Sequence, residues 1–475
     1  MLLASATELA RAIRTGEVRS RTVVDAHIAR IQAVNPRINA VVADRFDAAR
    51  AEADAADAAV AAGGELPPLH GVPCTVKEAF AVTGMPWTGG LLARKGTVAD
   101  EDAVTVTRLR DAGAIVLGVT NLSELCMWME SDNPVYGRTS NPYDAGRTAG
   151  GSSGGEGAIV GAGASPFGLG ADVGGSIRMP AFFNGVFGHK PGSGVVPNAG
   201  QFPVNTSEAG LRLLGTGPIA RRGEDLPLLM RLLAGPTDDD PIVGPDPLGD
   251  PEAVTLSGMR VLVVPDNGFT PVDPALTEAQ DRAARGLAEL GAEVSTARFP
   301  LLKRSFDLWS TAMGEAEGPG AFRTLMRRPS RLGLLPHLFR PTELGGVHTL
   351  PATILGLVED VGSAFPSRTA RFTAMRHALR EELVDAIGDG VLLYPPYPVP
   401  APRHREPWLR PLSWVYTAIF NALGFPVTQV PLGLDAQGLP LGVQIVGAPG
   451  NDHVTIAAAV ALEQAGVARW VPPPA

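Results

Sequence analysis

The sequence predicts an α/β protein: a single large domain, residues 1–475, built on a mixed, mostly parallel central sheet with helices on both faces. Two observations predict this class. Short apolar and β-branched runs alternate with amphipathic runs along the chain, as in proteins made of strand–helix units. The composition, with 45% apolar and 19% charged residues, is that of a globular protein.

The N-terminal part begins with two predicted helices. Ser5-Ala6-Thr7-Glu8 forms a capping box that starts the first helix, which Gly16 ends. The second helix covers residues 21–34 and is stopped by Asn35-Pro36. The next predicted elements are a strand over 38–43, a surface helix over 46–62, a strand running into a loop over 71–80, a helix near 102–111 and a strand over 114–120.

The glycine-rich stretch 150–192 predicts a loop, a helix, a strand, a loop and a second helix. The helix covers 153–164, the strand 167–173, and the second helix begins at Ile177. Later predicted strands cover 259–264, 292–299, 391–398, 425–434 and 439–449, and later helices cover 274–290, 367–387 and 452–465. Similar strand–helix units lie on both sides of the Pro-, Gly- and Asp-rich stretch 233–259, so we interpret that stretch as a surface connection within one domain.

Composition also narrows the function. A net charge of −9 argues against a nucleic-acid partner, which requires clustered cations. Two cysteines are too few for a disulfide framework. The eight histidines are scattered without metal-ligand spacing, so we expect no metal and no cofactor. No signal peptide and no apolar run of about 18 residues are recognisable, so we expect a cytoplasmic protein without a membrane span.

Two glycine–serine segments carry the strongest functional signal. Gly150-Gly151-Ser152-Ser153-Gly154-Gly155 is followed by Gly174-Gly175-Ser176. Glycine allows sharp turns, and backbone N–H groups ahead of a helix bind anions. A phosphate-binding loop is the alternative, but the GxxxxGK[ST] pattern is absent.

The chain resembles the amidase signature family of serine hydrolases at three motifs, and the resemblance extends over nearly the whole chain. Ser152 and Ser176 are 24 residues apart, as in the family pattern, and Lys77 in HGVPCTVKEAF matches the family's lysine. The resemblance implies that Ser176 is the nucleophile and that Lys77 is the base. It also implies that Ser152, on a cis peptide bond, passes the proton from Ser176 to Lys77. Lysine therefore replaces histidine, and burial among apolar neighbours would lower its pKa.

The resemblance also implies an oxyanion hole of the N–H groups of Val173, Gly174, Gly175 and Ser176. Ser153, Asp172 and Arg178 are the implied supports of this loop. A surface ion pair is the alternative interpretation of Asp172 and Arg178. The motif-bearing core covers about residues 66–220, and a variable, substrate-capping region covers about 300–365.

Several stretches look closest to fatty-acid amide hydrolases, particularly the second type. In the glutamine-using relatives an acidic residue stands where Leu214 is here, and an apolar side chain cannot pair with an ammonium. We expect Cys126, Met127 and Trp128 to form an apolar substrate wall; ordinary core packing is the alternative.

One basic, apolar segment goes beyond these motifs. Residues 318–342 contain no acid. Its arginines are Arg323, Arg327, Arg328, Arg331 and Arg340, and its apolar residues include Phe322, Leu325, Met326, Leu332, Leu334, Leu335, Leu338 and Phe339. A weak contact with a membrane surface is one interpretation. A lid packed on the domain is the interpretation that we favour.

The sequence therefore predicts an amidase that hydrolyses a carboxamide C–N bond through a Ser-Ser-Lys acyl-enzyme mechanism. The expected substrate is a small-molecule amide with an apolar acyl or aryl portion. An esterase or aryl acylamidase with the same triad is the main alternative. A glutamine amidotransferase subunit and a catalytically dead binding protein are weaker ones. A homodimer is compatible with the family resemblance.

Overall fold

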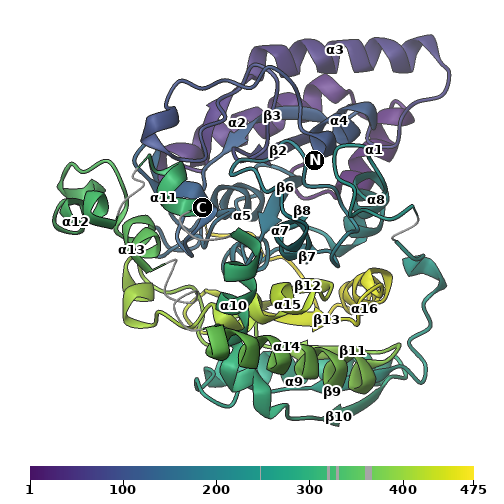
Figure 1. Cartoon of the computed structure of the whole chain (residues 1–475). Coiled ribbons are helices and arrows are strands. Elements are labelled where there is room, and N and C mark those ends of the chain that lie inside the picture. The colour runs from purple at the N-terminus through teal and green to yellow at the C-terminus, as the bar shows by residue number, and fades with distance from the viewer. Residues whose placement is uncertain (246–247, 318–320, 328–330, 359–365, 475) are drawn as a thin grey trace.

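An eleven-stranded sheet runs through the molecule in the order β1-β3-β2-β6-β8-β7-β12-β13-β11-β9-β10. The computed structural model describes residues 1–475 except 246–247, 318–320, 328–330, 359–365 and 475. The N-terminal helices lie at one end of the molecule, and α9, α14 and the last strands of the sheet lie at the other (Figure 1). One continuous sheet therefore unites both halves of the chain in one α/β domain.

The strands of this sheet are short. They are β1 (Val41–Asp44), β2 (Pro73–Lys77), β3 (Ile115–Thr120), β6 (Phe167–Asp172), β7 (Phe187–Lys190), β8 (Gly215–Ala220), β9 (Arg260–Val263), β10 (Glu293–Thr296), β11 (Val391–Tyr394), β12 (Val427–Leu434) and β13 (Pro440–Val446). A separate two-stranded ribbon is formed by β4 (Asp132–Asn133) and β5 (Gly137–Arg138).

Helices connect and cover these strands. The first eight are α1 (Ala6–Arg14), α2 (Ser20–Ile38), α3 (Phe46–Ala62), α4 (Val104–Asp111), α5 (Gly154–Gly161), α6 (Arg178–Phe183), α7 (Glu208–Leu213) and α8 (Leu226–Leu233). The others are α9 (Pro274–Glu289), α10 (Ser305–Glu317), α11 (Ala321–Leu325), α12 (Arg331–Phe339), α13 (Leu350–Val358), α14 (Pro366–Ile387), α15 (Val415–Leu423) and α16 (Asp452–Gln464).

The inner strands of the sheet are buried on both faces, as predicted, whereas the four residues of the edge strand β10 are exposed. Successive side chains of a strand point to opposite faces, and β9 shows the result. Val261 and Val263 belong to a core cluster that includes residues of α8, α9 and α16. Leu262 and Val264 belong to a different cluster, with residues of α14 and α15. Alternate residues of one strand thus bury two helical layers.

The sheet is mixed as predicted, but it is not mostly parallel. Among the described strands, four neighbouring pairs are parallel and six are antiparallel. The sequence analysis missed β7 and β8, whose Gly- and Pro-containing runs FGHK and GTGPIA carry little strand signal. Both strands pair antiparallel with their neighbours in the middle of the sheet and make three of the six antiparallel pairs.

Helix boundaries follow their caps. The Ser5 Oγ accepts the Glu8 amide at 2.9 Å, and Glu8 Oε2 accepts the Ser5 amide at 2.8 Å, so the predicted capping box is confirmed. The second helix does not stop before Pro36; it ends at Ile38. Asn35 Oδ1 accepts the amides of Ala40 and Val41 at 2.8 Å. This side chain satisfies the backbone beyond the proline, which lets the helix continue through its last turn.

The other predicted elements fall within a few residues of the observed ones. The stretch 233–259 contains, among its described residues, one short 3₁₀ turn, Pro251–Ala253, and no strand between α8 and β9. The division of the chain into a motif core and a variable cap stays a prediction. Within the described residues, none of the helices has both the length and the apolar character needed to cross a membrane.

Candidate active site

The Lys77 side chain lies at the end of β2, in the middle of the domain. The five residues of this strand are all buried, because β2 has parallel neighbours, β3 and β6, on both sides. Lys77 Nζ donates to Ser152 Oγ at 2.6 Å and to the Ala171 carbonyl oxygen at 3.5 Å. The structure thus brings two of the three predicted catalytic residues into direct contact.

The surroundings of Lys77 favour its neutral form. Burial lowers the pKa of the amine, and the nearby Cys126, Asp172 and Glu156 oppose this shift only in part. Glu78, the sequence neighbour, points elsewhere: its carboxylate accepts hydrogen bonds from the Thr88 amide, the Thr88 hydroxyl, the Gly89 amide and the Tyr136 hydroxyl. A base with a lowered pKa suits proton abstraction near neutral pH.

A second buried carboxyl lies close to this lysine. Glu156 Oε2 accepts from the Thr75 hydroxyl at 2.7 Å, and Oε1 accepts from the Thr120 hydroxyl at 2.9 Å. Burial raises the pKa of Glu156 to about 8, although the two threonines and Lys77 act in the opposite direction. Glu156 is therefore mostly protonated at neutral pH and adds little negative charge near Lys77.

Ser152 and Ser153 join the two glycine–serine segments. The Gly151–Ser152 peptide bond is cis. The Ser153 hydroxyl donates to the Ala171 carbonyl at 3.2 Å, and the Ser153 amide donates to the Ser176 carbonyl at 3.2 Å. The predicted supporting residue thus links the start of α5 to the loop between β6 and α6.

Ser176 lies just before α6 and lines the large cavity described below. It is 6% exposed, whereas Ser152 is 1% exposed. Among the described residues, no hydrogen bond joins the two serine hydroxyls. Catalytic hydrogen bonds are often long or absent before substrate binds and shorten in the substrate complex, so this arrangement is compatible with proton transfer between the two serines.

The loop Val173–Ser176, which we call the oxyanion loop, presents backbone N–H groups. The Gly175 amide donates to Asp172 Oδ1 at 2.6 Å. Among the hydrogen bonds of the described residues, none gives the amides of Val173, Gly174 or Ser176 a protein acceptor. Three of the four predicted amides thus remain available for a substrate oxyanion, and the Gly175 amide is already bound.

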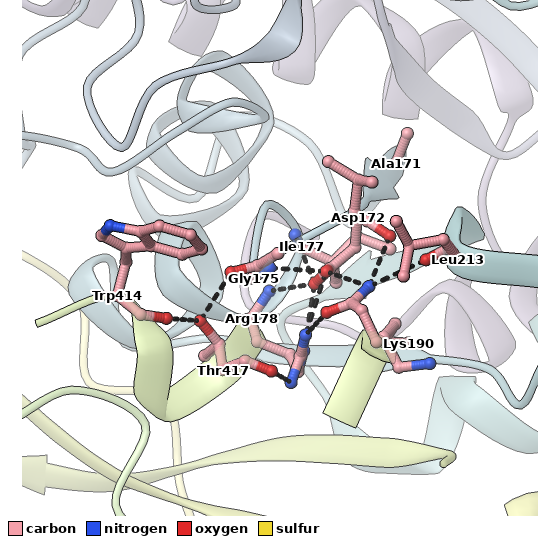
Figure 2. A network of polar contacts seen from close by, with 12 residues as sticks. Ala171, Asp172, Gly175, Ile177, Arg178, Lys190, Leu213, Trp414 and Thr417 are labelled. Carbon is pink, nitrogen blue, oxygen red and sulfur yellow. Dashed lines mark hydrogen bonds and ion pairs between the residues drawn. The ribbon is translucent and has the colours of Figure 1, made fainter. Parts of the chain in front are cut away.

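Asp172 and Arg178 lie beside this loop and hold it through hydrogen bonds (Figure 2). Their ion pair, at 3.0 Å, is completely buried, so the surface-pair interpretation is wrong. Burial alone would raise the pKa of Asp172, but the Arg178 guanidinium and the backbone amides hold it well below its usual range. Arg178 also donates to the Thr417 carbonyl, Gln444 Oε1 and Asn421 Oδ1. The motif is therefore anchored to the C-terminal part of the chain.

A cavity of about 720 Å³ opens beside Ser176. Cys126, Met127 and Trp128 line it, so the structure places the predicted substrate wall at the candidate nucleophile. Leu125 and Cys126 have positive φ values of 54° and 61°. Trp128 stacks on Trp408 at 4.8 Å between ring centroids.

The sequence analysis missed much of this cavity. Its other large lining side chains include Met179, Phe306, Trp309, Met313, Phe322, Ile354, Leu355, Phe372 and Trp414. Most of them come from α10, α13, α14 and the start of α15, which carry no motif. Tryptophans in the segments 300–317 and 408–414 were the available signal.

The basic segment 318–342 divides between burial and exposure. Phe322, Met326 and Leu334 are buried in a cluster with Trp309, as a lid would require. Arg323 is buried and donates to the Gly356 carbonyl. Leu335 and Phe339 are exposed on α12. Arg328 and the side chains of Arg331 and Leu332 lie outside the described residues.

Comparison with known proteins shows the family of the chain. Residues 22–456 match the family model described as Amidase, and the chain belongs to that family. Fatty-acid amide hydrolase 2-B of Danio rerio is 47% identical over 100% of this chain and 91% of its own length. Fatty-acid amide hydrolase 2 of Homo sapiens is 44% identical with the same coverage. A solved fatty acid amide hydrolase superposes with a TM-score of 0.81 at 25% identity, covering 98% of this chain and 86% of that one.

The protein is therefore a hydrolase that acts on amides and is similar to fatty-acid amide hydrolases.

Proposed function

We propose that the protein hydrolyses carboxamides with an apolar acyl or aryl portion through a Ser176–Ser152–Lys77 relay. One observation carries this proposal: a fully buried lysine donates at 2.6 Å to a serine hydroxyl beside a cavity that Ser176 lines. Lys77 can act as a base only when its amine is neutral. Burial lowers the pKa of this amine, which favours the neutral form.

The proposed reaction has two halves. Ser176 Oγ attacks the amide carbon and gives its proton to Ser152, which passes its own proton to Lys77. The N–H groups of Val173, Gly174 and Ser176 stabilise the oxyanion. The relay then runs in reverse: Ser152 protonates the leaving amine and regains a proton from Lys77. A water molecule hydrolyses the acyl-enzyme by the same route.

The proposed acyl site is the cavity. Its wall is mostly aromatic and aliphatic, and the relatives named above are called fatty-acid amide hydrolases. Burying one methylene group stabilises a complex by about 0.8 kcal/mol, which corresponds to roughly a fourfold gain in kcat/KM. We therefore expect kcat/KM to rise with acyl chain length until the cavity is full.

The test is a series of 4-nitroanilides with acyl chains of increasing length. Gly314 lines the cavity, and no atom lies within 4 Å of the position that a Cβ would take there. The variant Gly314→Leu should therefore lose activity on long chains while retaining activity on the acetyl compound. A kcat/KM that is independent of chain length in the wild type would overturn the acyl-site proposal.

Ester hydrolysis by the same residues is the second candidate. Esters are easier acyl donors, so a matched ester and amide of one acyl chain separate the two activities. Equal or better turnover of the amide supports amidase specialisation. Hydrolysis of the ester alone would favour the esterase interpretation, and binding without turnover of either would favour the dead-site interpretation.

We also propose, as a subordinate point, a weak contact between α12 and a lipid surface. Phe339 and Leu335 are exposed on this helix, and Arg340 follows it. Sedimentation with anionic vesicles should decrease in Phe339→Ser and stay unchanged in Phe269→Ser, an exposed phenylalanine outside the cap. Equal sedimentation of all three proteins would contradict the proposed contact. The homodimer and the cytoplasmic location stay predictions.

A further inference from the structure

Every peptide unit inside the oxyanion loop has its carbonyl oxygen held from outside. The Thr417 hydroxyl is shared between the Gly174 carbonyl at 2.8 Å and the Trp414 carbonyl at 2.7 Å (Figure 2 shows Thr417 beside the loop). The Met179 amide donates to the Gly175 carbonyl at 2.7 Å. The Trp309 indole N–H donates to the Val173 carbonyl at 2.8 Å. The Thr417 hydroxyl belongs to α15 and the Met179 amide to α6, both of which Arg178 contacts or contains. The Trp309 indole belongs to α10.

The Trp309 contact controls one particular N–H group. A peptide unit is planar and trans, so its C=O and N–H bonds point in opposite directions. The Val173 carbonyl belongs to the same peptide unit as the Gly174 amide. A donor that fixes the Val173 carbonyl therefore also fixes the direction of the Gly174 N–H, one of the three amides available for an oxyanion.

Packing holds the indole in place. Trp309 lies edge to face with Trp414, at 4.5 Å between centroids and 82° between planes. A Cβ on Gly174 would lie 3.4 Å from Trp414 Cζ3 and 3.5 Å from Trp309 Cζ2. Both rings thus rest on the loop backbone, and Trp309 is only 8% exposed.

We propose that Trp309 is a positioning residue that aims the Gly174 N–H at the oxyanion through its indole N–H, in addition to lining the acyl cavity. This inference rests on the proposed Ser-Ser-Lys function of the same site. A wall residue affects substrate binding in proportion to the acyl chain that it contacts. A residue that aims an oxyanion donor affects the chemical step for every substrate alike.

The test compares Trp309→Phe with Trp414→Phe. Both tryptophans line the same cavity, but the Trp414 indole N–H donates to the Pro411 carbonyl at 2.7 Å rather than to the loop. Values of kcat and KM are measured with acetyl, hexanoyl and decanoyl 4-nitroanilides. Changes common to both variants report the altered wall. The extra effect in Trp309→Phe reports the lost donor.

We expect Trp309→Phe to lower kcat about tenfold or more, by the same factor for all three chains, since complete removal of one oxyanion donor costs about 10²–10³ in kcat. A trifluoromethyl ketone, which forms an oxyanion on Ser176, should lose affinity by a similar factor. A kcat loss that grows with chain length, or an unchanged kcat, would overturn the inference.

Two controls separate the possible failures. If Trp309→Phe does not fold, 3-benzothienylalanine at position 309 keeps the ring shape and removes only the N–H, and the same constant loss in kcat is expected. If the wild type is inactive on all anilides, or if Ser176→Ala remains active, the proposed function itself fails. An active wild type, an inactive Ser176→Ala and an unchanged kcat in the benzothienyl variant would refute the Trp309 role alone.

Discussion

At the scale of single residues, the chemistry depends on how one lysine stays neutral. Lys77 is enclosed by β2 and the two glycine–serine segments, and its amine faces a serine hydroxyl. The nearest carboxyls are either paired, as Asp172 is with Arg178, or protonated at neutral pH, as Glu156 is. Cys126, Asp172 and Glu156 act to raise the Lys77 pKa, but the effect of burial outweighs them.

We predict that Lys77→Met lowers kcat/KM for an anilide by about 10²–10⁴-fold, the usual contribution of a general base. The wild-type kcat/KM should fall as pH decreases through the lowered pKa of Lys77, because the protonated amine cannot accept a proton. This acidic limb should be absent from the residual activity of Lys77→Met.

Lys190→Met is the matched control for this pH profile. Lys190 is also buried, burial lowers its pKa to about 7, and its amine donates to the Pro191 carbonyl. The acidic limb should persist in this variant. If the acidic limb disappears in Lys190→Met and persists in Lys77→Met, the titrating group is Lys190, and this result contradicts a relay through Lys77.

Glu156 provides a prediction about stability and pH. Its folded pKa of about 8 lies above the ordinary value of about 4.3. The folded protein therefore binds more protons at this site than the unfolded chain does, and this contribution to stability is lost as pH rises through about 8. Glu156→Gln should reduce the fall in melting temperature between pH 6 and pH 9. An identical fall in both proteins would contradict the assignment.

At the scale of elements, the conformation of the oxyanion loop requires glycine at position 175. Gly175 has φ +121°, and a Cβ there would lie 2.0 Å from Thr417 Oγ1. We predict that Gly175→Ala moves the loop and lowers kcat by about 10²-fold. Gly450 also has a positive φ, +88°, but no atom lies near its Cβ position. Gly450→Ala should strain only its own turn, and an equal loss of kcat in both variants would refute the steric explanation.

The elements show where sequence reasoning succeeds. Periodicity and caps located α1, α3, β2, β6 and about half of the later elements, because each of these has a local apolar pattern. The two central strands β7 and β8 have no such pattern: they are held by pairing with β6 and β12, which are distant in sequence. The triad candidates came from the resemblance of three sequence motifs to the amidase signature family. Trp309 and Thr417 were missed because their contacts with the loop exist only after folding.

At the scale of the whole molecule, the site joins the N-terminal and C-terminal parts of the chain. The motif residues come from the first half of the chain, and Arg178 connects them to α15 and β13 through Thr417, Asn421 and Gln444. The cavity is then closed by α10, α13 and α14. The candidate active site is therefore a product of the complete domain.

We predict that Arg178→Met lowers the free energy of unfolding by about 3–5 kcal/mol, because it leaves the Asp172 carboxylate buried without its partner. Arg212→Met removes an exposed ion pair with Glu208 and should change stability by less than about 1 kcal/mol. Chemical denaturation measures both. Equal, small effects would show that the buried pair does not anchor the two halves of the chain.

The most direct test of the central claim is labelling with a fluorophosphonate probe, followed by peptide mapping. The probe should attach to Ser176 in the wild type, fail to attach in Ser176→Ala and attach more slowly in Lys77→Ala. Attachment to Ser152 or to another residue, or a labelling rate unaffected by Lys77→Ala, would contradict the Ser176–Ser152–Lys77 relay.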